Sequence, residues 1–255
     1  MSLAPRAYNR NIFNSTQQVY YGTDDGSKDG SFGEFEAIET HYENVDPSRK
    51  ENIHMISVIG GLYGLNLIHL WKPKKITFFD INPLAIVYFN IILKVWTTSD
   101  SAQHFLNRLT KGDYETTTED DDFIKENIQI VQKTGGIPRE RGAYSSHNRD
   151  LANSWRKALE NFDETKMYLI EAEINIRTEP MEGENFKEMI RSKTHHWIYA
   201  SNITQFHFFE LEMLKPSNVV LLQIHHEDAQ LLDLAEYAGN PVRVKFEYPI
   251  TVETI

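Results

Sequence analysis

The sequence predicts an α/β fold, a doubly wound and mostly parallel sheet with an antiparallel strand at its C-terminal edge. Short apolar runs alternate with segments of helical pattern, as expected for parallel strands that are covered on both faces. Gly60, Gly61 and Gly64 form a glycine turn that joins the first run to a helix. Near the C-terminus, Val242–Glu247 alternates apolar and charged side chains, a period of two that is typical of an antiparallel strand.

Length and composition limit the classes of protein that fit. A chain of 255 residues can bury a full core, and 40% hydrophobic content with 12% aromatic residues is typical of a folded protein. The net charge of −11 argues against a large nucleic acid as the partner. Without cysteine there is no disulfide framework and no thiolate metal site. No apolar run approaches the roughly 18 residues of a membrane span. We therefore expect a soluble, cytoplasmic protein with a small-molecule substrate.

The chain divides into an N-terminal extension and one larger domain. Residues 1–50 are polar and irregular, with a predicted helix over Gly33–Tyr42. This extension is either a lid over a ligand cleft or a surface loop with a packing helix. Residues 51–255 form the predicted α/β domain, with an insertion at about 112–150. The acidic run Glu119–Asp122 in that insertion is typical of a solvated face rather than of a metal site.

Apolar patterning and helix signals place the elements in order. Proline near the start of a helix and glycine or proline after its end set several of the boundaries. The predicted strands are Met55–Ile59, Ile76–Phe79, Met167–Ile176, His195–Ala200 and Asn218–Ile224. The predicted helices are Leu65–Trp71, Leu84–Trp96, Asp100–Thr110, Leu151–Asn161, Asn185–Lys193, Gln205–Leu214 and Asp228–Tyr237.

The glycine turn and a following acid predict a nucleoside site. In an open α/β sheet, ligands bind outside the carboxyl ends of the strands, at the point where the strand order reverses. Asp80 ends the second strand, where a carboxylate accepts hydrogen bonds from ribose hydroxyls. Ile81 and Asn82 flank the expected position of the base. The alternative role for Asp80 is to cap the helix that begins at Pro83.

Polar residues at other strand ends are further candidates. Ser201 and Asn202 follow the fourth strand, where an amide or hydroxyl would orient a nucleophile or hold an amino group; a helix cap is the alternative. Glu171 and Glu173 lie in or near the third strand, where a carboxylate would accept from an adenine amino group.

Histidines and known motifs complete the list of candidates. Five histidines lie between residues 195 and 226: His195, His196, His207, His225 and His226. They lack the spacing of a metal site, so we expect no metal. One of them at a strand end is a candidate base. The motifs of α/β-hydrolases and P-loop nucleotidases are missing from the sequence.

Three segments carry a family resemblance. V-I-G-G-L-Y-G-L-N-L at 58–67, F-F-D-I-N-P at 78–83 and W-I-Y-A-S-N-I at 197–203 resemble motifs of the class I S-adenosylmethionine-dependent methyltransferase superfamily. The resemblance spans roughly residues 54–250 and implies a Rossmann-like domain that binds S-adenosylmethionine. Two features depart from the family pattern: Val58 and Ile59 stand where an acid usually ends the first strand, and the fourth-strand motif is not N-P-P-Y.

The resemblance also implies roles for individual residues. Gly60, Gly61 and Gly64 would contact the methionine part of the cofactor and Asp80 its ribose. Ser201 or Asn202 would lie at the reacting end.

A narrower similarity concerns one branch of the superfamily. The G-x-x-G-x-N at Gly61, the D-x-N-P at Asp80 and the S-N-I at Ser201 are similar to those of betaine-lipid type 3-amino-3-carboxypropyl transferases. We therefore expect a transferase that uses S-adenosylmethionine, with methyl transfer to a small molecule first and aminocarboxypropyl transfer second. A NAD-binding oxidoreductase, or a non-catalytic binding or assembly protein with the same fold, would also fit these segments.

Overall fold

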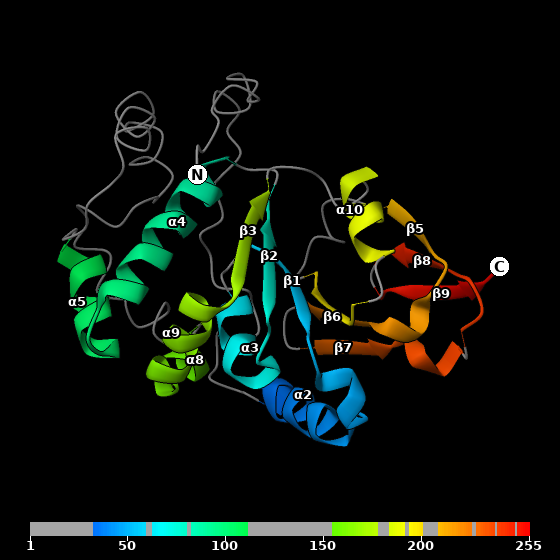
Figure 1. Ribbon diagram of the computed structural model, residues 1–255, viewed down its shortest axis with the longest axis horizontal. Coiled ribbons are helices and arrows are strands. Elements are labelled where there is room, and N and C mark those ends of the chain that lie inside the picture. The colour runs from blue at the N-terminus through cyan, green and yellow to red at the C-terminus, as the bar shows by residue number, and fades with distance from the viewer. Residues whose placement is uncertain are drawn as a thin grey trace.

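The computed structural model describes residues 33–59, 63–80, 83–111, 155–177, 184–191, 194–200, 209–225, 228–237, 239–247 and 249–255. Among these residues a six-stranded sheet runs through the middle of the molecule in the order β3-β2-β1-β4-β6-β7 (Figure 1). Its strands are β1 His54–Val58, β2 Lys75–Phe79, β3 Glu173–Arg177, β4 His196–Tyr199, β6 Val219–His225 and β7 Asp228–Asp233. All neighbours pair in parallel except β7, which runs antiparallel to β6. The predicted α/β class and mostly parallel sheet are confirmed.

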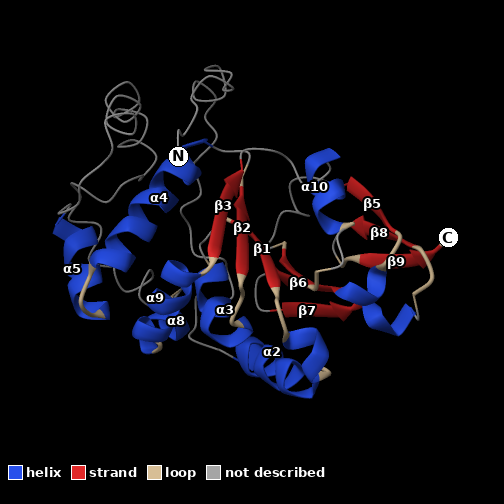
Figure 2. Cartoon of the chain, in the orientation of Figure 1, coloured by secondary structure: helices blue, strands red, loops and turns tan. Residues whose placement is uncertain are grey.

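Helices and a smaller sheet surround the main sheet (Figure 2). The α-helices are α2 Gly33–Asn44, α3 Gly64–Trp71, α4 Pro83–Thr98, α5 Ala102–Lys111, α8 Arg156–Glu160, α9 Phe162–Glu171 and α10 Glu184–Ile190. Short 3-10 helices are η3 Pro47–Lys50, η6 Pro216–Asn218 and η7 Leu234–Tyr237. In the described residues, β5 Phe209–Met213, β8 Val242–Phe246 and β9 Thr251–Thr254 form an antiparallel sheet in the order β5-β8-β9.

The two faces of the main sheet have different covers. Alternate strand residues point to opposite faces, so Met55 and Trp197 join a core built with α2, α3, α4 and α9. Ile56 and Ile198 face the other way, into a core built with α10 and the inner side of the smaller sheet. In the described residues the second face is therefore covered by α10, the 3-10 helix η7 and a sheet, where a doubly wound fold would have α-helices alone.

The segment predicted as the third strand, Met167–Ile176, is a strand only in its second half. Met167 to Glu171 belong to α9, and β3 begins at Glu173. Phe162, Thr165 and Leu169 are the buried residues of α9, and this spacing of three and four is helical. A short apolar run without that longer context does not separate strand from helix.

The helix predicted over Gln205–Leu214 is wrong. Residues 209–213 form β5, in which Phe209, Leu211 and Met213 are buried and the glutamates between them are exposed. This alternation has the period of a half-buried strand. The strand pairs with β8, whose own alternation was predicted correctly.

The helix predicted over Asp228–Tyr237 is also wrong, and it changes which strand lies at the edge of the main sheet. Residues 228–233 form β7, paired antiparallel with β6 from His225 opposite Asp228. The antiparallel edge is therefore β7. Val242–Phe246 is antiparallel as predicted, but it is the middle strand of the smaller sheet. The strand β9 had no counterpart among the predicted elements.

The helix predicted within the N-terminal extension is present as α2. Its Phe35 and Ile38 are buried in the main core. Figure 1 places α2 near the amino-terminal ends of the central strands, away from their carboxyl ends. This helix therefore packs on the core of the main sheet. The rest of the extension, residues 1–32, and the insertion at 112–150 lie outside the described residues.

Candidate functional site

The strand order reverses between β1 and β4. From β1 the chain adds β2 and then β3 on one side, whereas β4 and β6 lie on the other side. In open α/β sheets this reversal leaves a crevice at the carboxyl ends of the two strands, and ligands bind there. Gly60, Gly61, Ile81, Asn82, Ser201 and Asn202 fall outside the described residues, so their predicted roles stay predictions.

Asp80 lies at this carboxyl edge, next to the end of β1. The backbone N–H of Ile59 donates to the carbonyl of Phe79 at 3.0 Å, so β1 and β2 remain paired up to the start of the glycine turn. The N–H of Asp80 donates to the carbonyl of Arg177, at the end of β3, at 3.2 Å. Asp80 is half-buried. The backbone at the end of β2, where Asp80 is predicted to bind ribose, is thus bonded to both neighbouring strands.

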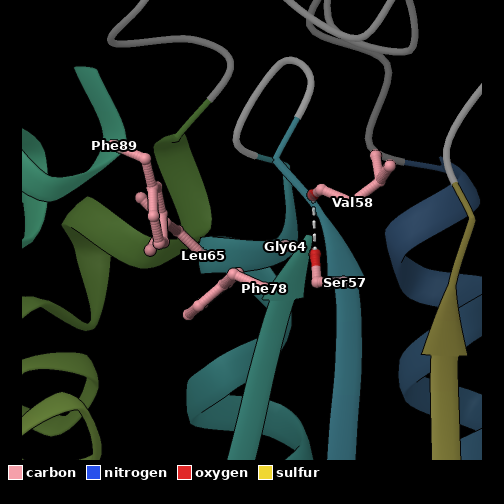
Figure 3. A pocket seen from close by; sticks show the side chains of 6 residues that line it. All are labelled: Ser57, Val58, Gly64, Leu65, Phe78 and Phe89. Carbon is pink, nitrogen blue, oxygen red and sulfur yellow. Dashed lines mark hydrogen bonds between the residues drawn. The ribbon is translucent and has the colours of Figure 1, made fainter. Parts of the chain in front are cut away.

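Gly64 brings the first turn of α3 against β1. A Cβ atom at this position would lie 2.2 Å from Ser57 Oγ, 3.1 Å from Ser57 Cβ and 3.3 Å from Met55 Cε. Figure 3 shows Gly64 directly beside Ser57, whose hydroxyl donates to the Val58 carbonyl at 2.9 Å. Close helix–strand packing is the role of the last glycine in nucleotide-binding turns. Its predicted contact with a ligand is a separate role that the packing does not test.

A small pocket lies beside Gly64 under the carboxyl edge. It is lined by Ser57, Val58, Gly64, Leu65, Phe78 and Phe89 (Figure 3), and it has no room even for a water molecule. Ligand pockets typically have about 300–1,000 Å³. This hollow alone is therefore too small for a nucleoside, and a nucleoside site would have to lie above it, at the strand ends.

Two tyrosines pack against each other beside the strand reversal. Tyr63 precedes α3 and Tyr199 ends β4; their ring centroids are 5.4 Å apart, and both residues are almost fully buried. The rings pack between the start of α3 and the end of β4, so any ligand at the reversal would lie outside them. Neither residue was predicted from the sequence as part of a site, although Tyr63 lies within the glycine turn.

Asn66 shows what the asparagine of the G-x-x-G-x-N pattern does in this chain. It is fully buried in α3, and its Oδ1 accepts the backbone N–H of Ala158 at 3.0 Å. Ala158 lies in the first turn of α8, where backbone N–H groups lack partners within the helix. Asn66 thus fixes α8 on α3, a structural role.

We expect Asn66→Ala to destabilise the protein by about 1–2 kcal/mol, because it leaves the buried N–H of Ala158 without this acceptor. Urea unfolding monitored by circular dichroism measures the change. Asn107→Ala, at an exposed position of α5, is the control and should have little effect. Equal stabilities of Asn66→Ala and Asn107→Ala would show that the Asn66–Ala158 bond contributes nothing.

Glu171 and Glu173 do not lie at the crevice. Glu171 is in the last turn of α9, and Glu173 is the first residue of β3, at the opposite edge of the sheet from Asp80. Glu173 instead forms an ion pair with Lys75 at 3.1 Å. Their predicted role in binding adenine is therefore wrong, because the strand begins later than expected. The residue that β3 brings to the carboxyl edge is Arg177.

The histidines are spread over the sheet. His195 and His196 lie at the amino-terminal end of β4 and His225 at the carboxyl end of β6, while His207 and His226 are outside the described residues. Across the described part of the chain, no three histidine or acidic side chains are grouped as metal ligands. Among the helices described, none has the length and apolar character needed to cross a bilayer.

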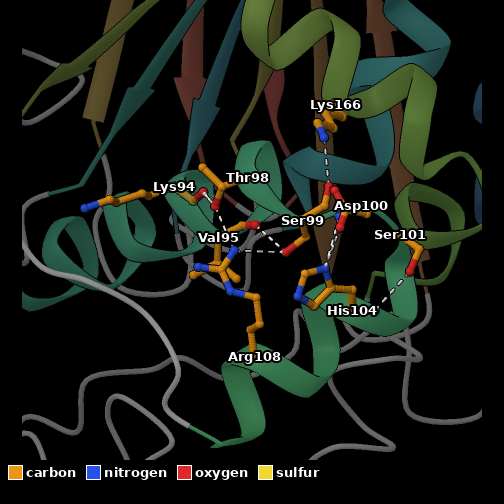
Figure 4. Close-up of polar contacts among 9 residues, drawn as sticks. All are labelled: Lys94, Val95, Thr98, Ser99, Asp100, Ser101, His104, Arg108 and Lys166. Atoms are coloured by element: carbon orange, nitrogen blue, oxygen red, sulfur yellow. Dashed lines mark hydrogen bonds and ion pairs between the residues drawn. The ribbon is translucent and has the colours of Figure 1, made fainter.

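A cluster of polar contacts lies at the junction of α4 and α5 (Figure 4). Arg108 donates to Thr98 Oγ1 at 2.8 Å, and Lys166 donates to the Ser99 carbonyl at 2.7 Å. Ser101 Oγ accepts the N–H of His104 at 3.1 Å and so caps α5. These contacts lie within the protein and join α4, α5 and α9, so the cluster is a structural junction.

Comparisons with known proteins identify no family. A scan against models of protein families finds no match to this chain. A search of curated proteins finds no match either. Functional inference therefore depends on the carboxyl edge of the main sheet.

Proposed function

We propose that the protein is an S-adenosylmethionine-dependent methyltransferase of Rossmann-like fold that acts on a small-molecule acceptor. The observation that carries the proposal is Asp80, half-buried at the carboxyl end of β2, beside the strand whose glycine turn leads into α3. A ribose acceptor lies in this place in open α/β sheets. The order β3-β2-β1-β4, with its reversal beside β1, further supports the proposal.

The residues fit a nucleoside cofactor in their chemistry. Asp80 offers carboxylate oxygens to two ribose hydroxyls, and the first N–H groups of α3 are donors near the same strand ends. Gly64 allows the first turn of α3 to approach β1 closely. When bound, S-adenosylmethionine supplies an activated methyl group on a sulfonium. The protein's part is to hold the acceptor in line with it and to exclude water.

Ser201 and Asn202 complete the proposed site as the residues after β4. An uncharged amide or hydroxyl there would orient the acceptor or hold the amino group of the cofactor. The transfer requires a base only if the nucleophile carries a proton. Transfer of the aminocarboxypropyl group is the alternative reaction of the same cofactor, and Asp80 would hold the ribose in the same way.

A NAD-binding oxidoreductase is the second candidate, because dinucleotide-binding sheets share this strand order and this acid. The turn Gly60–Gly64 lacks the G-x-G-x-x-G pattern of such enzymes, which favours the transferase.

A thermal-shift comparison of three ligands tests the proposal. S-Adenosylmethionine at about 100 times its Kd should add about 2.7 kcal/mol of stability, which raises Tm by about 5–10 °C in a chain of this size. Its demethylated product should also raise Tm, and NAD should not. A shift with NAD alone would replace the transferase by an oxidoreductase. No shift with any of the three would favour a non-catalytic binding or assembly protein.

A further inference from the structure

Two histidines lie side by side at the amino-terminal ends of the two central strands. His54 is the first residue of β1, and it is paired in register with His196, the first residue of β4. Their imidazole rings meet edge to face with centroids 5.2 Å apart. The residues are only 2% and 0% exposed. The seam between β1 and β4 therefore begins with two buried titratable rings in contact.

The surroundings of the pair suit neutral rings. His54 Nε2 is hydrogen-bonded to Thr77 Oγ1 at 2.8 Å. Near the pair, positively charged groups outnumber negatively charged ones. The single carboxylate, that of Glu173, already forms an ion pair with Lys75 at 3.1 Å. The charged and titratable groups facing the pair are Lys75 on β2, Glu173 and Arg177 on β3, and His195 before β4. A positive charge on either ring would lie buried and poorly compensated.

We propose that His54 and His196 form an acid-sensitive latch: as neutral rings they hold the amino-terminal ends of β1 and β4 together, and protonation opens this seam. The backbone N–H of His54 donates to the carbonyl of His195 at 2.8 Å, a bond that opening would break. β1 and β4 are the two middle strands, so the seam joins the two halves of the sheet. The carboxyl ends of β1 and β4, where the strand order reverses, lie at the other end of the same seam.

The direction of the pH effect follows from burial. Burial is the largest cause that lowers the pKa of His54 to about 3, and the adjacent His196 lowers it further. Burial also lowers the pKa of His196 to about 4, with His195 adding to the effect. In the unfolded chain both rings take up a proton near pH 6.5. The stability that the neutral pair contributes is thus fully present above pH 6.5 and is lost as the pH falls from 6.5 towards 4.

Urea unfolding of the full chain between pH 4.5 and 7.5 tests the latch. Below pH 6.5 the unfolded ring is protonated while the folded ring stays neutral. Each such ring then raises the unfolding equilibrium constant about tenfold for every unit by which the pH falls. Between pH 5.5 and 4.5 the unfolding equilibrium constant should rise about tenfold less in His54→Gln, and about tenfold less in His196→Phe, than in the wild-type protein. His104→Gln is the matched control, because that side chain is 43% exposed; it should keep the wild-type slope. Equal slopes for wild type and both seam variants would overturn the proposal.

Two measurements on the wild-type protein keep the test independent of whether the variants fold. In NMR spectra of protein with ¹³C-labelled histidine, at least two imidazoles, those of His54 and His196, should remain neutral at pH 5; titration of every imidazole near pH 6.5 would overturn the proposal. In hydrogen exchange, corrected for intrinsic rates, peptides over 54–58 and 196–199 should lose protection between pH 7 and 5. Peptides over 228–233, in β7, should lose less, and an equal loss everywhere would contradict an opening at the seam.

Discussion

Asp80→Ala is expected to weaken binding of S-adenosylmethionine by about 100- to 10,000-fold. A carboxylate that accepts two ribose hydroxyls makes two charge-assisted hydrogen bonds, each worth about 1.5–3 kcal/mol, and 1.4 kcal/mol is a factor of ten. The fold should persist, because the backbone bond from Asp80 to the Arg177 carbonyl does not depend on the side chain. Isothermal titration calorimetry measures Kd, and circular dichroism checks the fold.

Two further variants separate ribose binding from a general loss of charge. Asp80→Asn keeps the size of the side chain but not its charge, and should bind with an affinity between those of wild type and Asp80→Ala. Asp163→Ala, at an exposed position of α9, removes the same charge far from the crevice and should leave Kd unchanged. If Asp80→Ala binds as tightly as Asp163→Ala, then Asp80 does not hold the ribose.

The buried central strands were predictable because each is a short, mostly apolar run. β1, β2, β4 and β6 were placed to within about two residues, the usual uncertainty at element ends. The strands β5 and β7 were not recognised. Their pairing partners, β8 and β6, decide their structure, and a short segment does not reveal a partner elsewhere in the chain. The cover of the second face was missed for the same reason.

The candidate site was predictable where it depends on the order of elements along the chain. Asp80 follows from an acid placed after an apolar run, and the structure puts it at the carboxyl edge. The bond from Asn66 to Ala158 joins residues 92 positions apart, and no local pattern indicates it. The predicted position of Glu173 was wrong because the third strand begins later than expected. A later start puts this residue at the amino-terminal end of the strand instead of nearer its carboxyl end.

Gly64→Ala is expected to destabilise the protein by about 2–3 kcal/mol, in the range of overpacked cores. The added methyl group would lie 2.2 Å from Ser57 Oγ, so either that hydroxyl must leave its bond to the Val58 carbonyl or α3 must move away from β1. The greater helix propensity of alanine offsets at most about 1 kcal/mol of the cost. Urea unfolding at pH 7.5 measures the difference.

Ser57→Ala provides the decisive comparison, because it removes the nearest atom and leaves Cβ at 3.1 Å as the closest contact on that residue. The double variant Ser57→Ala/Gly64→Ala should therefore lose less stability than the sum of the two single losses, since the two positions are in contact. Gly239→Ala separates this steric cost from backbone strain: Gly239 has φ of +79° and no atom within 4 Å of an added Cβ. Its loss of about 1 kcal/mol should come from conformation alone. Additive losses at Ser57 and Gly64 would mean that α3 does not depend on this contact for its approach to β1.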